Sequence, residues 1–506
     1  MWTPSNLEKE RLLKLAHLRE EGVEPYPRRA LRTHTTAQAI SAYQSNVNDS
    51  EMIEVTVAGR IRRLNLKGKI AFLHIEDEHG RLQLFLRINN MDEDEFLLVK
   101  NKLVEIDDFV QASGTMMETQ AGEISVLVHE FKLLAKTISP LPVIKSVEKD
   151  DGEFEAYGEF SNIETRYRQR YVDLAVNKHV REIFLRRTKI IRAMQNFLDD
   201  EGMLEVETPI LQPIYGGAAA RPFTTHHNQL HQDLFLRISF ELYLKRLLVG
   251  GFDAVYEIGR DFRNEGVSKK HNPEFTMMEF YKAYIDYQGV MDIVERMTAS
   301  IAEQVAGTTV IRYQGHEVDL TPPWKRMTIQ EAVQVHPGID YMDYPDAESL
   351  AEVLKAKFNR STSTGDSWGR LVVENLLGDF VEPNLIQPTF IINYPRDVSP
   401  FAKPTENFPN HTERFELFIA GMEMGNAFTE LNDPEDQAMR FAEMAELYRQ
   451  GTDEETPLDE DYLRAMRYGM PPMGGFGMGV DRLVMLLTDQ PNIREVLLFP
   501  HLRSDV

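Results

Sequence analysis

The amino-acid sequence predicts a multidomain protein of mixed α and β structure, in which a small β-barrel precedes a larger region of helices and strands. Its 506 residues exceed the length that one hydrophobic core usually serves. Residues 53–132 contain five short β-like runs separated by glycine-containing turns. Residues 139–162 mix proline, glycine and acidic residues without periodicity, which is typical of a linker between domains.

Composition limits the classes of function. The formal net charge of −24 argues against indiscriminate binding to nucleic acids or anionic membranes, but not against a local basic surface. The chain contains no cysteine, which excludes disulfides, thiolate metal sites and cysteine nucleophiles. No apolar stretch approaches the roughly 18 residues of a membrane span, and no secretory signal is visible. We therefore expect a cytoplasmic protein with no membrane partner.

Residues 1–140 are expected to form the first domain. Four leucines at helical spacing predict an amphipathic helix over residues 5–21 that packs on its own domain. The five β-like runs follow, interrupted by a polar segment at 91–104 that could be a helix. Five strands with an inserted helix are typical of the OB fold, which often binds oligonucleotides.

A local excess of positive charge supports nucleic-acid binding by this barrel. Residues 58–87 contain seven arginines and lysines but only three acidic residues, which gives this segment a net charge of +4 in a chain of net charge −24. Phe72 and Phe85 lie among these charges, and aromatic rings beside cations suit base stacking and phosphate contact. The pattern alone, however, favours burial of both rings in the barrel core.

The rest of the chain is expected to comprise a linker at 141–178 and a large domain at 179–506. From the pattern alone this is a generic α/β region. A long helix ends near Gly202, and the segment MLEVETPIL is a predicted strand that a proline stops. The stretch from about 290 to 370 has a mainly helical pattern and is expected to be an insertion.

The segment FRNEGVSKKHNPEF, residues 262–275, carries dense charge between two apolar stretches. The flanking residues can pair as antiparallel strands around a loop at 263–274, longer than the usual two to five residues. Long loops on a rigid scaffold tend to be functional. Arg263 can bind a phosphate or carboxylate with two hydrogen bonds. Further contacts could come from Glu265, Lys270, His271 and Phe275. The segment suits a nucleotide, although a solvated hairpin would have the same composition.

A second segment, GGFGMGVDRLVMLL, places Gly475, Gly477 and Gly479 at a period of two. Glycine within a strand lets a ligand or another backbone approach closely. Arg482 follows at the start of a predicted helix, where its charge adds to the positive end of the helix dipole. This combination suits a polyphosphate or a stacked purine.

Two glutamates suggest a metal site. Glu416 and Glu423 lie on either side of Gly421, which is consistent with a second hairpin. Carboxylates without cysteine favour an oxygen-ligated ion such as Mg²⁺ over zinc, and Mg²⁺ usually bridges carboxylates and substrate phosphates. Two ordinary surface glutamates would give the same pattern.

Further carboxylates could share one pocket. Residues two apart in a strand lie on the same face. Two such sets are Asn426, Phe428 and Glu430, and Glu279 with Tyr281. Glu241 lies in the separate segment RISFELYLKRLL. If the three glutamates face one cavity, a ligand that carries two ammonium groups would compensate their charge.

These segments, in this order, resemble the class II aminoacyl-tRNA synthetases, and most closely the lysyl-tRNA synthetases of the bacterial type. EGMLEVETPIL (201–211) looks like the first family motif, a dimer-forming strand that ends in Pro209. GRDFRNEG…HNPEF looks like the second motif, and GFGMGVDR the third. The resemblance covers essentially the whole chain. It implies an α+β multidomain fold, with an OB-fold anticodon-binding domain and a class II catalytic domain, an antiparallel sheet flanked by helices, in a homodimer.

The resemblance also implies roles for individual residues. The lysine site would comprise Gly217, Glu241, Arg263, Glu279, Tyr281, Asn426, Phe428 and Glu430. The ATP site would comprise Arg263, Glu265, Lys270, His271, Asn272, Phe275, Glu416, Glu423 and Arg482. Glu416 and Glu423 would ligate Mg²⁺, and the residues expected to take part in catalysis are Arg263 and Arg482. The anticodon would contact Phe72, Gln83 and Glu123.

The implied reaction is the ATP-dependent activation of L-lysine to lysyl-adenylate, followed by transfer to the 3′ end of tRNA(Lys). Related enzymes of the aspartyl or asparaginyl type share the three motifs, but they need cationic or amide groups in the pocket. A non-catalytic RNA-binding protein derived from a synthetase is a further alternative, against which the intact arginines and glutamates argue.

Two departures from the family pattern bear on the pocket. Ser239 and Phe240 stand where a small residue is usually followed by proline or threonine, and Phe240 is expected to reshape the pocket rim. Met473 stands where threonine is common, just before the glycine strand. Neither departure removes a proposed contact.

Overall fold

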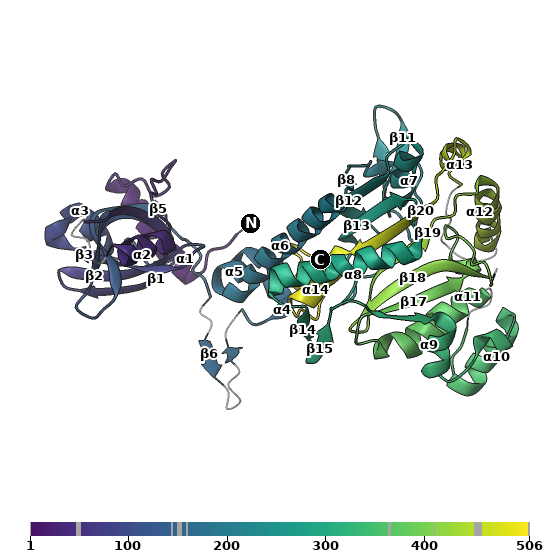
Figure 1. Ribbon diagram of the computed structural model, residues 1–506. Coiled ribbons are helices and arrows are strands. Elements are labelled where there is room, and N and C mark those ends of the chain that lie inside the picture. The colour runs from purple at the N-terminus through teal and green to yellow at the C-terminus, as the bar shows by residue number, and fades with distance from the viewer. Residues whose placement is uncertain are drawn as a thin grey trace. The chain divides into compact units, whose positions relative to one another are not determined.

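The computed structural model forms two compact units, residues 1–161 and 162–506 (Figure 1). The residues that it describes are 2–46, 52–142, 145–148, 154–157, 160–362, 366–408, 410–449 and 458–503. Among them, no helix is long and apolar enough to cross a membrane. Part of the predicted linker lies outside the described residues. The acidic segment TDEETPLDEDY (452–462) predicts a surface loop, and its residues 452–457 lie outside the described residues as well.

The first unit contains a closed five-stranded barrel with the strand order β1-β2-β3-β5-β4. Its strands are β1 (Glu54–Lys67), β2 (Ile70–Glu76), β3 (Arg81–Arg87), β4 (Phe109–Glu118) and β5 (Ile124–Ala135). Neighbouring strands are antiparallel except for the parallel pair β3 and β5. The inserted helix is α3 (Glu93–Lys100), within the polar segment at 91–104, and α2 (Thr36–Ser45) precedes the barrel. The barrel predicted from the five β-like runs is thereby confirmed.

Helix α1 (Asn6–Glu20) packs on this unit, as its leucine pattern predicts. The helix starts with a capping box, in which the Ser5 side chain accepts from the Glu8 backbone and the Glu8 carboxylate accepts from the Ser5 backbone. Leu15 and Leu18 are buried, and Leu18 belongs to the barrel core. Apolar burial therefore holds one face of the helix against the barrel.

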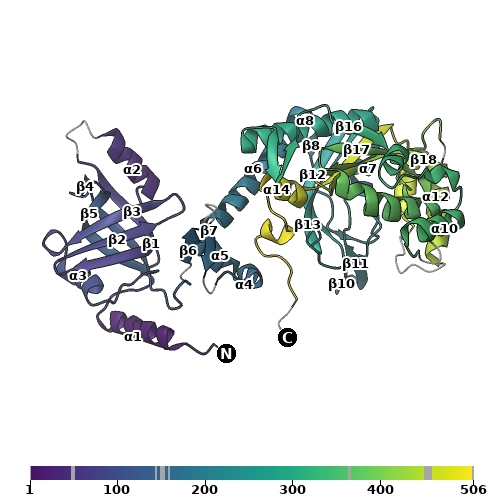
Figure 2. The ribbon, with the colours of Figure 1, turned by 90° about the horizontal axis from the view of Figure 1, so that it is seen from below.

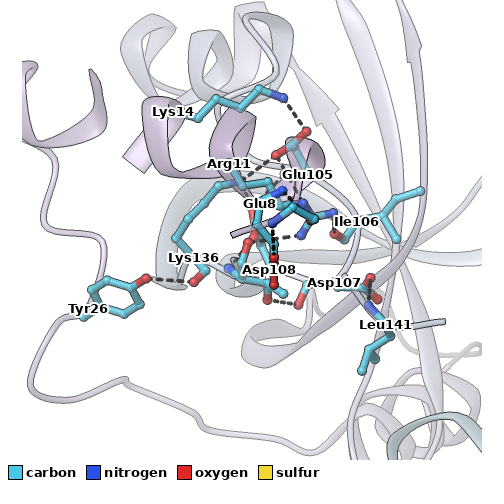
Figure 3. Close-up of polar contacts among 12 residues, drawn as sticks. Glu8, Arg11, Lys14, Tyr26, Glu105, Ile106, Asp107, Asp108, Lys136 and Leu141 are labelled. Atoms are coloured by element: carbon cyan, nitrogen blue, oxygen red, sulfur yellow. Dashed lines mark hydrogen bonds and ion pairs between the residues drawn. The ribbon is translucent and has the colours of Figure 1, made fainter. Parts of the chain in front are cut away.

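Buried charges hold α1 in a defined position (Figure 3). The guanidinium of Arg11 donates hydrogen bonds of 3.1 Å to the carbonyl oxygens of Ile106 and Thr137. Beside it, the fully buried Lys136 donates to Asp108 at 2.9 Å. Burial raises the pKa of Asp108, and the positive charge of Lys136 opposes that rise. The cluster thus pairs charges that would be costly to bury alone.

The second unit is built on an eight-stranded sheet with the order β16-β17-β18-β19-β20-β13-β12-β8. Six of the strands form the antiparallel core: β17 (Thr389–Pro395), β18 (His411–Ile419), β19 (Met422–Thr429), β20 (Met473–Gly479), β13 (Glu274–Ala283) and β12 (Ala254–Phe262). Parallel pairs occur at both edges, where β16 (Lys325–Thr328) meets β17 and β8 (Leu204–Glu205) meets β12. The antiparallel α+β architecture is confirmed.

Three helices, α6 (Lys178–Asp200), α8 (Tyr287–Ala306) and α14 (Val480–Leu487), cover one face of this sheet (Figures 1 and 2). Phe280 of β13 and Phe476 of β20 face them in the main core. The alternate residues Glu279 and Tyr281 point to the opposite face. Helices α7 (Glu241–Val249), α12 (Pro434–Arg449) and α13 (Glu460–Arg467) are associated with that second face. Glu279 and Tyr281, which are predicted to bind a ligand, therefore lie opposite the main core.

Two regions are more structured than the sequence pattern suggests. The stretch assigned to a linker contains α4 (Ile163–Arg168) and α5 (Arg170–Val176), and between residues 145 and 157 the short strands β6 (Lys145–Glu148) and β7 (Phe154–Tyr157). The stretch expected to be a helical insertion starts within α8 of the main core. It also contains β14 (Val310–Tyr313), β15 (His316–Asp319), the edge strand β16, α9 (Ile329–Val335), the 3₁₀ turn η2 (Tyr341–Asp343), α10 (Ala347–Phe358) and α11 (Trp368–Arg370), and the π-helix η3 (Leu371–Val381) follows it.

The segment MLEVETPIL is not one continuous strand. It forms β8 and, after Pro209, β9 (Leu211–Gln212), which pairs with β11 (Gln232–Leu236) next to β10 (Thr224–His227). Between them, Thr208 donates to the Glu257 carboxylate from its backbone N–H at 3.0 Å and from its hydroxyl at 2.7 Å. The same carboxylate pairs with the buried Arg237 at 2.6 Å. After β8 ends, hydrogen bonds to the Glu257 side chain of β12 thus hold this segment, in place of backbone hydrogen bonds between strands.

We expect Arg11→Ala to loosen α1 from the barrel, because it removes two charge-assisted hydrogen bonds to backbone carbonyl groups in a partly buried setting. The free energy of unfolding of the first unit should fall by about 2 kcal/mol. Hydrogen exchange of the amides in α1 and β4, measured on the full chain, would report this loss. Arg19→Ala, in the exposed last turn of the same helix, is the matched control, and equal exchange in the two variants would contradict the assigned role of Arg11.

Candidate active site

The predicted hairpin forms as expected. Strands β12 and β13 pair with Glu257 opposite Glu279, and the loop between the strands runs from residue 263 to residue 273. The Arg263 backbone N–H donates to the Pro273 carbonyl at 2.8 Å and closes the loop. The Arg263 guanidinium lies over the Phe275 ring, 5.2 Å from its centre. The two ends of the loop therefore place a cation and an aromatic face side by side.

The glycines of β20 make room for side chains of the neighbouring strands. Gly475 lies opposite Tyr281 of β13 and Phe428 of β19. A Cβ at Gly475 would overlap Glu430 Oε1 and the Tyr281 ring. The sequence predicted a close approach at this strand, and at this position the approaching groups are side chains of the protein itself.

Two adjoining cavities lie on this face of the sheet. The first has a volume of about 560 Å³ and is lined by every residue predicted to bind lysine. These are Gly217, Glu241, Arg263, Glu279, Tyr281, Asn426, Phe428 and Glu430. The second has a volume of about 160 Å³ and is lined by the residues predicted to bind ATP, except Glu416. These are Arg263, Glu265, Lys270, His271, Asn272, Phe275, Glu423 and Arg482. Arg263 and Asn426 line both cavities.

Three buried carboxylates dominate the first cavity. Glu241, Glu279 and Glu430 are each at most 5% exposed. Glu279 accepts hydrogen bonds from the hydroxyls of Ser239 at 2.9 Å and Tyr281 at 3.1 Å. Burial, together with the negative charge of Glu241, raises the pKa of Glu279 to about 7. The cavity thus combines high negative charge density with little water to screen it.

A lysine that the sequence did not single out stands behind two of these carboxylates. Lys245 is fully buried, donates to Glu241 Oε1 at 2.5 Å and forms an ion pair with Glu430 Oε2. Burial raises the pKa of Glu430 to about 8, although the positive charge of Lys245 opposes that rise. The only sequence signal for Lys245 is its position four residues after Glu241 on α7, which is also the spacing of an ordinary surface ion pair.

Glycine at position 217 lets the loop before β10 approach α7. Gly217 has a φ of +88°, a region that residues with a side chain rarely adopt. A Cβ here would lie 3.0 Å from Glu241 Cβ and from Ser239 Oγ. The backbone of this loop can therefore form one wall of the first cavity.

The second cavity is cationic and partly aromatic. Arg482 lies in the first turn of α14, and its guanidinium contacts Glu423 Oε2 at 3.2 Å and His271 Nε2 at 3.1 Å. Burial and the charge of Arg482 lower the pKa of His271, which favours a neutral ring. Lys270 donates to the Gly421 carbonyl at 2.8 Å. Arg263, Lys270 and Arg482 thus surround the space in front of Phe275.

The two glutamates predicted to hold a metal come from the β18–β19 hairpin, which turns at Gly421. Glu416 accepts from Arg414 at 2.6 Å and from the Tyr394 hydroxyl at 2.9 Å. Among the described residues, no group of three or more histidines and carboxylates is arranged to hold a metal. A third carboxylate, Glu382, is nevertheless close enough for the negative charges of Glu416 and Glu423 to affect its pKa.

Burial and the negative charges of Glu416 and Glu423 raise the pKa of Glu382 to about 7. The local field is therefore negative enough to favour a cation. A pair of carboxylates that leaves positions open for phosphate oxygens fits Mg²⁺, which keeps several non-protein ligands. Neither Glu382 nor Arg414 was singled out from the sequence, although Arg414 and Glu416 share a strand face.

The departure at position 240 does not act as expected. Phe240 is fully buried and lies beneath the Arg237 guanidinium, 4.0 Å from ring centre to Cζ. It is absent from the residues that line either cavity, so the expectation that it shapes the pocket rim is wrong. Ser239, in contrast, lines the first cavity. Met473 is fully buried in the core.

Known proteins resemble this chain along its whole length. A family model described as tRNA synthetases class II (D, K and N) matches residues 162–503. The chain belongs to this family. A model described as an OB-fold nucleic acid binding domain matches residues 55–134. The resemblance that the motifs indicated is confirmed, and the chain is an aminoacyl-tRNA ligase by family.

Curated relatives of this class II synthetase carry the name lysine–tRNA ligase. The protein of Chloroflexus aurantiacus is 51% identical over 503 residues, with 99% of each chain covered. That of Roseiflexus castenholzii is 51% identical over 502 residues, again with 99% of each chain covered. That of Pelotomaculum thermopropionicum is 49% identical over 488 residues, which cover 96% of this chain and 93% of the relative.

The barrel of this synthetase brings together the residues predicted to read an anticodon. Phe72 of β2 and Phe85 of β3 stack with ring centres 4.8 Å apart, and both are half-buried outside the barrel core. Gln83 Nε2 donates to Glu123 Oε2 at 2.6 Å. His74 Nε2 contacts Glu123 Oε1 at 2.7 Å and was missed in the sequence. The core placement that the strand pattern favoured for the two phenylalanines is wrong.

Fewer positive charges are free on this surface than the sequence count of arginines and lysines suggests. Arg62 pairs with Asp107 at 3.3 Å, and Arg81 pairs with Glu76. Arg60 donates to the Asp107 carbonyl at 3.0 Å. These contacts within the barrel use part of the charge that the sequence assigned to phosphate binding.

We expect Gly475→Ala to damage the first cavity, because the new methyl group would overlap Glu430 and the Tyr281 ring. Overpacking of this kind lowers stability by about 1–3 kcal/mol. Thermal unfolding measurements would detect the loss. Gly479→Ala in the same strand is the control, since its Cβ would meet Arg482 Cδ at an ordinary 3.7 Å. A melting temperature for Gly475→Ala equal to that of Gly479→Ala would contradict the packing argument.

Proposed function

We propose that this chain is a lysine–tRNA ligase, which activates L-lysine with ATP and transfers the lysyl group to the 3′ end of tRNA(Lys). The junction of the two cavities at Arg263 and Asn426 carries the proposal. One cavity suits a small molecule with two ammonium groups, and the other suits a nucleotide. Reaction between their occupants would take place at the shared boundary.

In this proposal, each ammonium group of lysine has an acidic partner in the first cavity. Glu241 and the Gly217 backbone would bind the α-ammonium group. Glu279, Tyr281 and Glu430 would bind the side-chain ammonium group. Glu430 Oε2 pairs with Lys245, whereas Glu430 Oε1 is buried without a hydrogen-bond partner among the described residues, so Oε1 can accept a hydrogen bond from a ligand. Three carboxylates in one cavity disfavour aspartate, and an uncharged asparagine side chain would leave them uncompensated.

The carboxylate of lysine would lie at the boundary of the cavities, and Phe428 would pack along the aliphatic stem. Arg263 can donate to that carboxylate and to the α-phosphate of ATP at once, because a guanidinium has five N–H donors. Asn426 would support the same carboxylate. The ligand is thereby oriented with its nucleophilic oxygen toward the second cavity.

In the second cavity, Phe275 and Arg482 would enclose the adenine ring, with Glu265 and Asn272 as polar contacts to adenosine. Lys270 and the neutral His271 would lie near the outer phosphates. Two buried polar atoms support ligand binding here, because neither Arg263 Nε nor Asn272 Oδ1 has a hydrogen-bond partner among the described residues. Such groups are costly to bury unless a ligand pairs them.

We further propose that Glu416 and Glu423 hold Mg²⁺ with the phosphates. When bound, the ion would supply charge neutralisation for the phosphate oxygens. Glu416 is kept in place by Arg414 and Tyr394, so one carboxylate of the pair is already oriented by the protein. The raised pKa of Glu382 reflects the same negative field.

The chemistry then needs no side-chain nucleophile. The lysine carboxylate attacks the α-phosphorus, a P–O bond to pyrophosphate breaks, and lysyl-adenylate forms. A ribose hydroxyl at the 3′ end of the tRNA next attacks the adenylate carbonyl and releases AMP. Arg263 contributes by holding both reacting groups and by stabilising charge on the α-phosphate. Phe72, Gln83 and Glu123 on the barrel would bind the anticodon of the same tRNA.

Purified protein should exchange labelled pyrophosphate into ATP when L-lysine is present, and not with other amino acids. The physical reason is that only lysine supplies two ammonium groups to the three carboxylates. A panel that includes L-aspartate and L-asparagine measures this selectivity directly. Equal exchange with aspartate would sink the lysine assignment, and no exchange with any amino acid would favour the non-catalytic alternative.

We also propose a homodimer formed around the segment at 201–211. Three apolar side chains there are close to half exposed, at 48% for Leu204, 44% for Ile210 and 48% for Leu211. Exposed apolar residues grouped in this way favour association. Sedimentation equilibrium should give twice the 58.3 kDa of one chain, and Leu204→Glu should weaken the dimer. A single-chain mass at micromolar concentration would rule the homodimer out.

A further inference from the structure

Lys245 is unusual among the charged groups near the first cavity, because it contacts two of the proposed ligand-binding carboxylates and no solvent. Helix α7 places Glu241 and Lys245 four residues apart on one face, and both are buried. Lys245 Nζ donates to Glu241 at 2.5 Å and pairs with Glu430, which follows β19. One ammonium group thus links a helix to the end of a strand.

Apart from these two carboxylates, the groups next to the Lys245 ammonium group are mainly aromatic rings. Its Nζ lies 5.0 Å from the centre of the Phe401 ring and 5.7 Å from that of Tyr281, so aromatic rings enclose it. Lys245 is not among the residues that line the cavity, whereas Glu241 and Glu430 are. A ligand in the cavity would meet the carboxylates, and the lysine would act on it only through them.

We infer that Lys245 is a positioning residue, which holds the carboxylates of Glu241 and Glu430 in place and supplies one fixed positive charge beside them, for a ligand with two ammonium groups. The inference rests on the proposed function. When all three glutamates are ionised around a bound ligand, the ammonium group of Lys245 compensates one of their three negative charges and leaves two. A lysine molecule brings two ammonium groups and offers its carboxylate to Arg263. Lys245 therefore leaves two carboxylate charges in the cavity, which is the number that the two ammonium groups of this substrate can compensate.

The groups around Lys245 define what its removal would change. Those that face it are Glu241 on α7, Glu430 after β19, Tyr281 on β13 and Tyr462 on α13, while Glu279 and Arg414 act on the two glutamates. The charge of Lys245 lowers the pKa of both Glu241 and Glu430. Without it, burial and mutual repulsion would raise both pKa values further and leave a smaller fraction of each carboxyl group ionised at neutral pH.

A purely structural ion pair would behave differently. It would contribute to the stability of α7, and its loss would weaken all ligands together or none. A positioning role affects lysine more than ATP, and it does so most at the pH values where the carboxyl groups take up protons. The pH dependence of the KM for lysine therefore separates the two roles.

The test is Lys245→Met, which keeps the length of the side chain and removes its charge. The KM for L-lysine in pyrophosphate exchange should rise about tenfold or more at pH 7.0, because a charged hydrogen bond is lost on each glutamate. The KM for ATP should stay within about twofold. Between pH 7.0 and pH 9.0, the ratio of the variant KM to the wild-type KM for lysine should fall by about threefold or more, as the carboxyl groups ionise again.

Lys282→Met is the matched control. Lys282 follows Tyr281 on the opposite face of β13 and pairs with Glu201 at 3.7 Å, so the variant should keep the wild-type KM for lysine at every pH. A KM of Lys245→Met within twofold of wild type, or a KM ratio that does not change with pH, would overturn the inference. An equal rise in the KM for ATP would also overturn it.

If Lys245→Met does not fold, Lys245→Arg provides the test of the inference. It retains the positive charge but changes its geometry, so the KM for lysine should rise at all pH values by the same factor. A ratio that depends on pH in Lys245→Arg would contradict a role through charge. Exchange by the wild-type protein with L-lysine tests the proposed function separately, since only the comparison of variant with wild type concerns Lys245.

Discussion

The position of β20 between β13 and β19 is the constraint on which the site depends. All three strands are antiparallel, and their register sets Tyr281 and Phe428 on either side of Gly475. Because the central strand carries glycine there, side chains from two non-adjacent strands can meet above it. A larger residue would separate the wall that carries Glu279 from the wall that carries Glu430. The main core on the opposite face, built on Phe476 and Phe280, holds this register in place.

Burial gives the site its electrostatic character. Carboxylates withdrawn from water have raised pKa values, and the protein offsets this with partners of different kinds. Glu279 receives two hydroxyl hydrogen bonds, Glu416 receives an arginine and a tyrosine, and Glu241 receives Lys245. Each carboxylate is thus held in one orientation before any ligand is bound. That pre-organisation lowers the cost of ordering the site around small, highly charged molecules.

Local sequence rules predicted a large part of this arrangement. Spacings of two residues correctly placed Asn426 and Phe428 on one strand face, and the apolar flanks of the charged segment located the hairpin of Arg263. Lys245 could not be found this way, because a Glu–Lys pair at helical spacing usually lies on the surface and only the tertiary fold buries it. Phe240 was misplaced for a related reason. Its ring lies beneath the Arg237 guanidinium, which Glu257 of β12 holds in place, and this contact between distant segments has no signal in the local sequence.

The narrow boundary between the cavities has an evolutionary consequence. They share only Arg263, Met277, Asn426 and Gly477 among the described lining residues. The carboxylates proposed to recognise the amino acid come from α7, β13 and the end of β19, whereas the groups proposed to surround the nucleotide come from the hairpin loop and α14. Mutations in one wall can therefore accumulate without disturbing the other. A common adenylation frame can in this way be inherited intact while its amino-acid selectivity diverges, as a family grouped under D, K and N requires.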